Sequence, residues 1–322
     1  MPRSTLPPST GAEKTDRVRE RGHGMDVCVI GGSRHFGRRL IGELRDAGAA
    51  VTVVNRGSTP APHGVTRLLA DRDDEVALRT ALGARRFDVV IDQVCYSPLQ
   101  AAVAARVFAG RTRRYVLTST VEVYAELARP GGPAVPEEAV DPAGHPFDLE
   151  LPWADERFLA DHYGEGKRQA EAFLAREAPF DVTAVRTAHV LGGADFTGRL
   201  AHYVERIERG LPVAVHPAPQ PASFVHEPEI ARFLAWAAAA DFTGPVNAAS
   251  HGALTVRELC EAIGGALGKE PRLTEGPDAV PSPFSFDRCY AMDTGRASGL
   301  GFGFSAVGDW LPQVIKETRG QR

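Results

Sequence analysis

The chain has 322 residues, 43% of them hydrophobic and 24% charged, which are ordinary values for a globular protein with ample core. A formal net charge of -4 gives no electrostatic basis for binding nucleic acid or an anionic membrane, and no stretch approaches the roughly 20 consecutive apolar residues that span a bilayer. The cysteines form no CxxC pair or zinc spacing, so we expect no metal site and free thiols in the reducing cytoplasm. They are Cys28, Cys95, Cys260 and Cys289.

The first 24 residues differ in composition from the rest of the chain. They are rich in Pro, Ser, Thr, Arg and Glu and lack the apolar middle of a signal peptide. This composition predicts a disordered N-terminal tail over residues 1–24, with Met25 as the start of the folded part.

From Asp26 onward, short apolar runs typical of strands alternate with segments of helical periodicity. Strands are expected at 27–30, 51–54, 88–94, 114–118 and 181–186, and helices at 38–47, 73–84, 98–109 and 153–176. Parallel strands need crossover connections, so this alternation predicts an α/β fold with a Rossmann-type doubly wound parallel sheet.

The alternation also predicts how the chain divides. Residues 125–152, rich in Pro, Gly and acidic residues, are expected to form a long loop beside a site. We expect residues 25–186 with 221–250 to form an NAD(P)-binding Rossmann domain. Residues 187–220 with 251–322 would then form a smaller C-terminal substrate-binding lobe.

Gly31, Gly32 and Gly37 lie where the first strand passes into the first helix. Glycines there permit a tight turn and allow a diphosphate to approach the backbone, where the helix N-terminus meets its charge. Because this pattern follows the first strand of an alternating chain, it indicates dinucleotide binding.

The end of the second strand bears on which dinucleotide is bound. An Asp or Glu is typical there for NAD, whereas this chain has Asn55 and Arg56, with Arg34 nearby in the glycine turn. Guanidinium groups suit a phosphate, so we expect NADP in preference to NAD. Asp71, after the apolar Leu68 at the end of the third strand, could accept from the adenine amino group or simply be an acid at a helix start.

A tyrosine and a lysine four residues apart, Tyr163 and Lys167, are the strongest chemical signal. On a helix they share a face, so the ammonium could lie beside the phenol and lower its pKa. Tyr163 would then be a usable acid or base at neutral pH. Upstream, Ser119 and Thr120 follow the strand at 114–118, where a hydroxyl could orient a substrate oxygen.

Together these segments resemble the extended, atypical short-chain dehydrogenase/reductases of the NAD-dependent epimerase/dehydratase family. The segments Val29-Ile-Gly-Gly-Ser-Arg-His-Phe-Gly and Val53-Val-Asn-Arg-Gly are especially similar to the branch that includes the chloroplast stem-loop RNA-binding proteins. The resemblance runs from about Met25 to Leu311 and includes Tyr163-Gly-Glu-Gly-Lys167.

The resemblance implies roles for particular residues. Thr120 would orient the substrate, Tyr163 would be the acid/base, and Lys167 would bind the nicotinamide ribose and lower the tyrosine pKa. The cofactor-binding residues that it implies, together with those argued above, are Gly31, Gly32, Ser33, Arg34, Phe36, Gly37, Asn55, Arg56, Asp71, Ser119, Tyr163 and Lys167.

The chain also departs from the family pattern. Arg34 stands where members usually have a glycine, Ala222 where nucleotide-sugar enzymes typically have an arginine, and the segment 186–189 lacks their asparagine. Without these anchors, a nucleoside diphosphate would lose charge-assisted contacts, so the substrate could be smaller or differently charged.

Three further side chains have two readings each. His189 and His226 could line the cleft or be structural histidines, and neither is assigned a catalytic role. Glu122 could be a second base for epimerisation or dehydration, although a solvated loop acid is the simpler interpretation.

We therefore expect an NAD(P)-dependent oxidoreductase that transfers hydride between nicotinamide and an alcohol or carbonyl carbon of a small polar metabolite. The alternatives are a redox-neutral epimerase or dehydratase acting on a sugar-like or nucleotide-linked substrate, and a non-catalytic NADP-binding sensor or RNA-associated protein. The expected partner is a small-molecule substrate, with no nucleic acid or membrane, and a homodimer is one possible assembly.

Overall fold

The computed structural model describes residues 24–58, 60, 62–193, 195–275 and 282–320. The predicted tail lies, apart from Gly24, outside the described residues.

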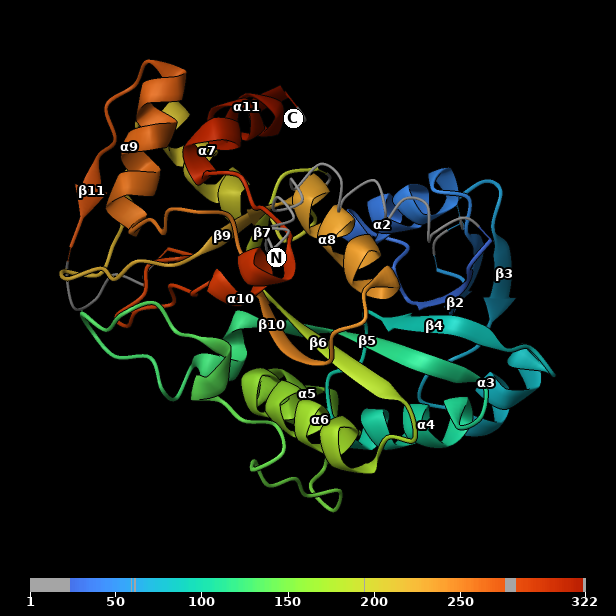
Figure 1. The fold of residues 1–322 in the computed structure, drawn as a ribbon. Helices are drawn as coiled ribbons and strands as arrows, with labels where there is room; N and C mark the ends of the chain where they lie inside the picture. The colour runs from blue at the N-terminus through green and yellow to red at the C-terminus, as the bar shows by residue number, and fades with distance from the viewer. Residues whose placement is uncertain (1–23, 59, 61, 194, 276–281, 321–322) are drawn as a thin grey trace, which may run out of the picture.

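A seven-stranded parallel sheet forms the centre of the molecule (Figure 1). Its strand order is β10-β6-β5-β4-β1-β2-β3. The strands are β1 (Asp26–Ile30), β2 (Ala50–Asn55), β3 (Thr66–Leu69), β4 (Phe87–Asp92), β5 (Thr112–Thr120), β6 (Asp181–Thr187) and β10 (Gly244–Ala248). The predicted doubly wound Rossmann-type sheet is thereby confirmed.

Helices cover both faces of this sheet (Figure 1). On one face lie α3 (Glu75–Leu82), α4 (Pro98–Phe108), α5 (Glu156–Asp161) and α6 (Tyr163–Glu177); on the other lie α2 (His35–Asp46) and α8 (Glu227–Ala239). Alternate side chains of a strand point to opposite faces. Val27 and Val29 of β1 accordingly belong to the core beneath α2 and α8, while Cys28 and Ile30 belong to the core beneath α4 and α6.

The remaining elements gather at the carboxyl end of the sheet. Two small parallel strand pairs lie there, β7 (His189–Leu191) with β9 (Phe224–His226) and β8 (Val213–Ala214) with β11 (Leu273–Thr274). The helices are α7 (Arg199–Glu208), α9 (Val256–Leu267), α10 (Gly295–Leu300) and α11 (Val307–Gly320). The 3-10 turns are η1 (Val121–Tyr124) and η2 (Glu137–Ala139). None of the helices in the described part of the chain combines the length and apolarity that crossing a bilayer requires.

The single helix expected at 153–176 is wrong, because the chain forms two helices there. His162, with φ -116° and ψ 28°, ends α5 and precedes α6. The break allows α6 to approach η1 closely: a β-carbon on Gly164 would lie 2.6 Å from the main-chain oxygen of Glu122. Tyr163 therefore occupies the first position of α6 rather than the middle of a long helix.

Candidate active site

A cleft of about 1310 Å³ lies across the carboxyl ends of the parallel strands. Its lining includes residues that follow β1, β2, β3, β4 and β5, the start of α6, and residues from the stretches 187–190 and 196–199. This is the edge where open parallel sheets bind ligands. The cleft therefore brings the predicted catalytic residues and all the predicted cofactor residues except Gly37 into one continuous space.

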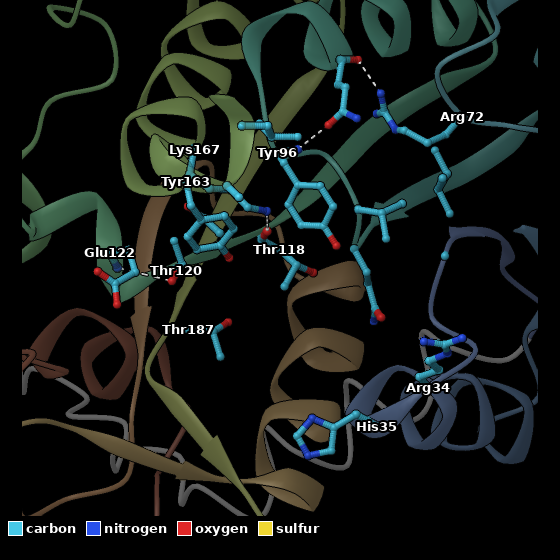
Figure 2. Close-up of a pocket in the computed structure, with 18 of the residues that line it drawn as sticks. Arg34, His35, Arg72, Tyr96, Thr118, Thr120, Glu122, Tyr163, Lys167 and Thr187 are labelled. Carbon is cyan, nitrogen blue, oxygen red and sulfur yellow. Dashed lines mark hydrogen bonds between the residues drawn. The ribbon is translucent and has the colours of Figure 1, made fainter. Parts of the chain in front are cut away.

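Tyr163 and Thr120 meet in this cleft, although they come from different elements (Figure 2). Their hydroxyls share a hydrogen bond, and the Glu122 main-chain N–H donates to Thr120 Oγ1 at 3.2 Å. Tyr163 keeps 36% of its surface exposed, so a substrate in the cleft can reach it. The pairing of a phenol with a substrate-orienting hydroxyl, expected from the sequence, is geometrically available.

Lys167 lies one turn further along α6 and is 1% exposed. Its ammonium donates to the main-chain oxygen of Thr118 at 2.7 Å and lies 4.7 Å from the centre of the Tyr96 ring (Figure 2). Burial, which disfavours the charged form, lowers the pKa of Lys167 to about 8.

The expectation that Lys167 lowers the pKa of Tyr163 is not met in this structure, where the pKa of the phenol is raised. Burial of the hydroxyl is the largest cause and Tyr96 adds to it, while the hydrogen bond with Thr120 opposes it. Sequence spacing gives the shared helix face, but it does not report desolvation, which here is the larger effect.

Ser119 does not use its hydroxyl as the sequence led us to expect. The hydroxyl donates to Glu171 Oε1 at 2.5 Å, and the side chain is 3% exposed. Glu171 also binds the buried Arg186 at 2.6 Å, and Arg186 in turn donates to the hydroxyl of Tyr124 at 2.9 Å. Ser119 thus anchors the end of β5 to a buried ionic network, although it still borders the cleft.

The glycine turn lies at the opposite half of the cleft. Gly31, Gly32, Ser33, Arg34 and Phe36 line it. Gly37 packs beneath the turn, where a β-carbon would lie 2.2 Å from Gln93 Oε1 and 2.5 Å from Gly32 Cα. Any larger residue would force the first turn of α2 away from the strand ends.

Two buried polar atoms at the cleft, one beside the glycine turn and one near the end of β5, have no hydrogen-bond partner among the described residues. They are Gln93 Nε2 and Thr118 Oγ1, and both residues line the cleft. Buried polar groups are normally satisfied, so unpaired ones along the cleft fit a polar ligand. With its length and its exposed backbone turn, the cleft suits a dinucleotide.

At the adenosine end, Asn55 accepts from the Gly57 main-chain N–H at 3.0 Å and donates to Ser33 Oγ at 2.8 Å. The side chain at the end of β2 is therefore neutral, and the exposed Arg56 follows it. Asp71 also borders the cleft, but its Oδ1 accepts from the Asp73 main-chain N–H at 3.1 Å. Both readings of Asp71 thus remain compatible with its position.

Beyond Tyr163, the cleft is lined by Glu122, Thr187, His189 and Arg199. Glu122 is half-buried and hydrogen-bonded to Tyr290, and burial raises its pKa. A freely solvated loop acid is therefore the wrong interpretation of Glu122. The Arg199 guanidinium lies 5.0 Å from the centre of the Phe284 ring.

The two histidines with alternative readings lie in different places. His189 borders the cleft and stacks on Phe286 at 5.2 Å, and its burial lowers its pKa to about 3, so the ring is neutral. His226 stacks on Trp310 at 5.0 Å and does not line the cleft. His226 is therefore a structural histidine, packed against Trp310.

Sequence reasoning missed Tyr96, Arg199 and His35. Tyr96 stands four residues after the end of β4, a signal that could have been used because that strand ends at the site. Arg199 carries no motif. His35 adopts a φ of +47° and its Nε2 lies 2.9 Å from the Gly192 main-chain oxygen, linking the glycine turn to the segment after β7, a contact between residues distant in sequence.

No family model and no curated protein matches this sequence. Its structure, however, is similar to solved structures. The Thermus thermophilus UDP-glucose 4-epimerase, in complex with NAD, is 21% identical, with a TM-score of 0.69 over 92% of this chain and 100% of that chain. The Thermotoga maritima UDP-glucose 4-epimerase, with UDP-glucose, is 19% identical, with a TM-score of 0.72 over 92% and 99%.

The Bordetella bronchiseptica enzyme WbmG, in complex with NAD and UDP, is 18% identical, with a TM-score of 0.69 over 93% of this chain and 94% of that chain. At such identities the likeness establishes the fold. The chain has the fold of these solved structures, which agrees with the α/β fold that the resemblance described above implies.

Proposed function

We propose that this protein is an NAD(P)-dependent, redox-neutral enzyme of the epimerase type, acting on a sugar-like or nucleotide-linked substrate. The observation that carries the proposal is the hydrogen-bonded pair Tyr163 and Thr120, with Lys167 behind it, in the same cleft as the glycine turn. The similar folds of the UDP-glucose 4-epimerases favour this reading over net oxidation or reduction.

In the proposed reaction, Tyr163 exchanges a proton with a substrate hydroxyl through its phenolic oxygen, and Thr120 orients that hydroxyl. Lys167, one helical turn after Tyr163, contributes positive charge to the same end of the cleft. When bound, the cofactor would supply the hydride acceptor and, in its oxidised form, a positive charge that favours the ionised phenol. Tyr163 then returns the proton when the carbonyl is reduced again.

The test of this proposal is a product analysis with UDP-glucose and a panel of sugar-like alcohols and carbonyl compounds, each with NAD and with NADP. We expect an isomerised product, identified by NMR, without net change in reduced-nicotinamide absorbance. An absorbance change stoichiometric with product would instead establish a net oxidoreductase. Binding of a cofactor without turnover of any member of the panel would contradict the proposal and favour the non-catalytic NADP-binding alternative. No binding of either cofactor would contradict both.

Dehydration is the second redox-neutral outcome, and Glu122 is the observation that favours considering it. Its half-buried carboxyl borders the cleft beside Thr120, and its raised pKa suits a proton-transferring group. Deuterium exchange between solvent and a substrate carbon, lost in Glu122→Gln, would assign a second base. Turnover without such exchange would leave Tyr163 as the proton-transferring residue.

We further propose NADP in preference to NAD. Asn55 offers no carboxylate to an adenosine ribose, while Arg34 and Arg56 line the cleft around it. Both guanidinium groups could meet a 2′-phosphate. The Thermus thermophilus and Bordetella bronchiseptica structures were solved with NAD, so direct titration of this protein with both cofactors is the deciding measurement.

The remaining expectations are also carried forward as proposals. Residues 25–186 with 221–250 would bind the cofactor, with Asp71 at its adenine. Residues 187–220 with 251–322 would bind the substrate. Limited proteolysis with and without cofactor would test the division, and size-exclusion chromatography with light scattering would test the homodimer.

A further inference from the structure

Lys167 is a buried cation whose carboxylate neighbours are already engaged. Asp92 binds Arg72 at 2.6 Å, and Glu171 binds Arg186 at 2.6 Å. Those two ion pairs leave no uncommitted carboxylate among the charged groups that most affect Lys167.

The other groups that face Lys167 are uncharged. Burial raises the pKa of the Cys95 thiol to about 12 and raises the pKa values of the Tyr96 and Tyr163 phenols, so all three are protonated near neutral pH. The Thr118 carbonyl supplies one hydrogen bond. The remaining group close to the ammonium is the face of the Tyr96 ring, 4.7 Å away.

Tyr96 is held in place from two sides. Its main-chain N–H donates to Gln100 Oε1 at 2.6 Å, at the start of α4. A β-carbon on Gly166 would lie 2.4 Å from the Tyr96 main-chain oxygen, so only glycine lets α6 approach this closely. That approach brings Lys167, the next residue, over the Tyr96 ring.

The same ring also neighbours the candidate acid/base. The Tyr96 and Tyr163 ring centres are 6.1 Å apart, with an interplanar angle of 49°, and both side chains border the cleft (Figure 2). A desolvated ammonium is attracted to an aromatic face through the quadrupole of the ring. Tyr96 can therefore favour the charged form of Lys167 without contributing a charge of its own.

We propose that Tyr96 is a positioning residue, whose ring face keeps the Lys167 ammonium charged and oriented in the cleft beside Tyr163. The catalytic consequence of this arrangement rests on the proposed function, whereas the charge state of Lys167 does not. The two can therefore be tested separately.

The charge state can be measured directly, because the full chain has four lysines: Lys14, Lys167, Lys269 and Lys316. Lysine labelled with carbon-13 at Cε gives one NMR signal for each, and Lys167→Met assigns the signal of interest. We expect the wild-type Lys167 signal to titrate with a midpoint of about 8, and the Tyr96→Phe signal to titrate in the same range. In Tyr96→Leu we expect a midpoint lower by about one pH unit, a tenfold change in the protonation equilibrium.

Controls separate the ring from general effects of mutation. Lys269 and Lys316 are exposed, and their signals should be the same in wild type and in every variant. Phe147→Leu removes another ring that faces a cation, Arg176 at 4.2 Å, and should leave Lys167 unchanged. Tyr96→Met replaces the leucine variant if the latter does not fold.

An unchanged Lys167 midpoint in Tyr96→Leu or Tyr96→Met would overturn the proposal. An equal shift in Tyr96→Phe would also overturn it, because the hydroxyl rather than the ring would then be responsible. If turnover is found, Tyr96→Leu should lose activity near neutral pH and recover part of it at lower pH, with Tyr96→Phe close to wild type. Failure to find turnover would count against the proposed function while leaving the NMR result valid.

Discussion

The ammonium of Lys167 is joined to the main-chain oxygen of Thr118 by a 2.7 Å hydrogen bond, inside the protein and at the end of β5. This bond fixes a positive charge where the parallel strands end, but it only partly replaces the water that burial removes. This loss of hydration disfavours the charged form and lowers the pKa of Lys167 from an ordinary 10.5 to about 8.

Lys167→Met should therefore make the protein more stable while removing its activity. The folded-state pKa lies below the unfolded one, so the unfolded chain binds more protons between about pH 8 and 10.5, and the free energy of unfolding of the wild type rises with pH in that window. Below pH 8 the cost of the buried charge is fully present. We expect Lys167→Met to raise the free energy of unfolding at pH 7 by about 2–3 kcal/mol and to remove this pH slope.

Urea unfolding at several pH values measures both effects. Lys269→Met, at an exposed lysine, is the matched control and should change stability by less than about 0.5 kcal/mol. A Lys167→Met protein less stable than wild type at pH 7 would show that the hydrogen bond outweighs the cost of burial.

Tyr163→Phe should reduce turnover by about two to four orders of magnitude, because it removes the proposed acid/base while keeping the ring. The unfolding midpoint should change little, since the hydroxyl bonds only Thr120 among the described residues and lies at a partly open cleft. Steady-state kinetics on an identified substrate measure the loss. Tyr203→Phe, which deletes a hydroxyl bonded to the Pro283 carbonyl outside the cleft, should retain turnover. Full activity of Tyr163→Phe would exclude the proposed mechanism.

Glu171→Gln should destabilise the protein by about 3–5 kcal/mol, because it leaves the fully buried Arg186 without its counter-charge. The comparison is Asp161→Asn, which weakens an exposed pair with Arg157 at 3.8 Å and should cost less than about 1 kcal/mol. Denaturant unfolding at neutral pH gives both values. Similar effects of the two substitutions would mean that the buried network tolerates an unpaired arginine.

Arg56→Ser should weaken NADP binding by about tenfold and leave NAD binding nearly unchanged, because a guanidinium–phosphate contact exists for only one of the two cofactors. Isothermal titration of both cofactors measures the effect. Arg113→Ser makes the same change of charge at an exposed position outside the cleft and should alter neither affinity. Equal wild-type affinities for NAD and NADP would remove the proposed preference.

Much of the fold was predictable because its signals are local. The apolar run at Val27–Ile30, the glycines that follow it and the periodicity of the first helix each arise within a few residues, and all three reappear as β1, the turn and α2. The interruption of the helix expected at 153–176 was not predictable. The break at His162 accompanies the packing of Gly164 against Glu122, which lies more than 40 residues earlier in the chain.

The sequence by itself determined which chemical groups this protein possesses and roughly where they lie along the sheet. Spacing alone assigned Tyr163 and Lys167 to one helix and Thr120 to the end of a strand. Only the tertiary structure decided the contacts and pKa values of those groups. Ser119 donates a hydrogen bond to Glu171, the Tyr96 ring faces Lys167, and burial raises the pKa of Tyr163. Desolvation and contacts between distant segments set these properties, and neither is encoded in the spacing of neighbouring residues.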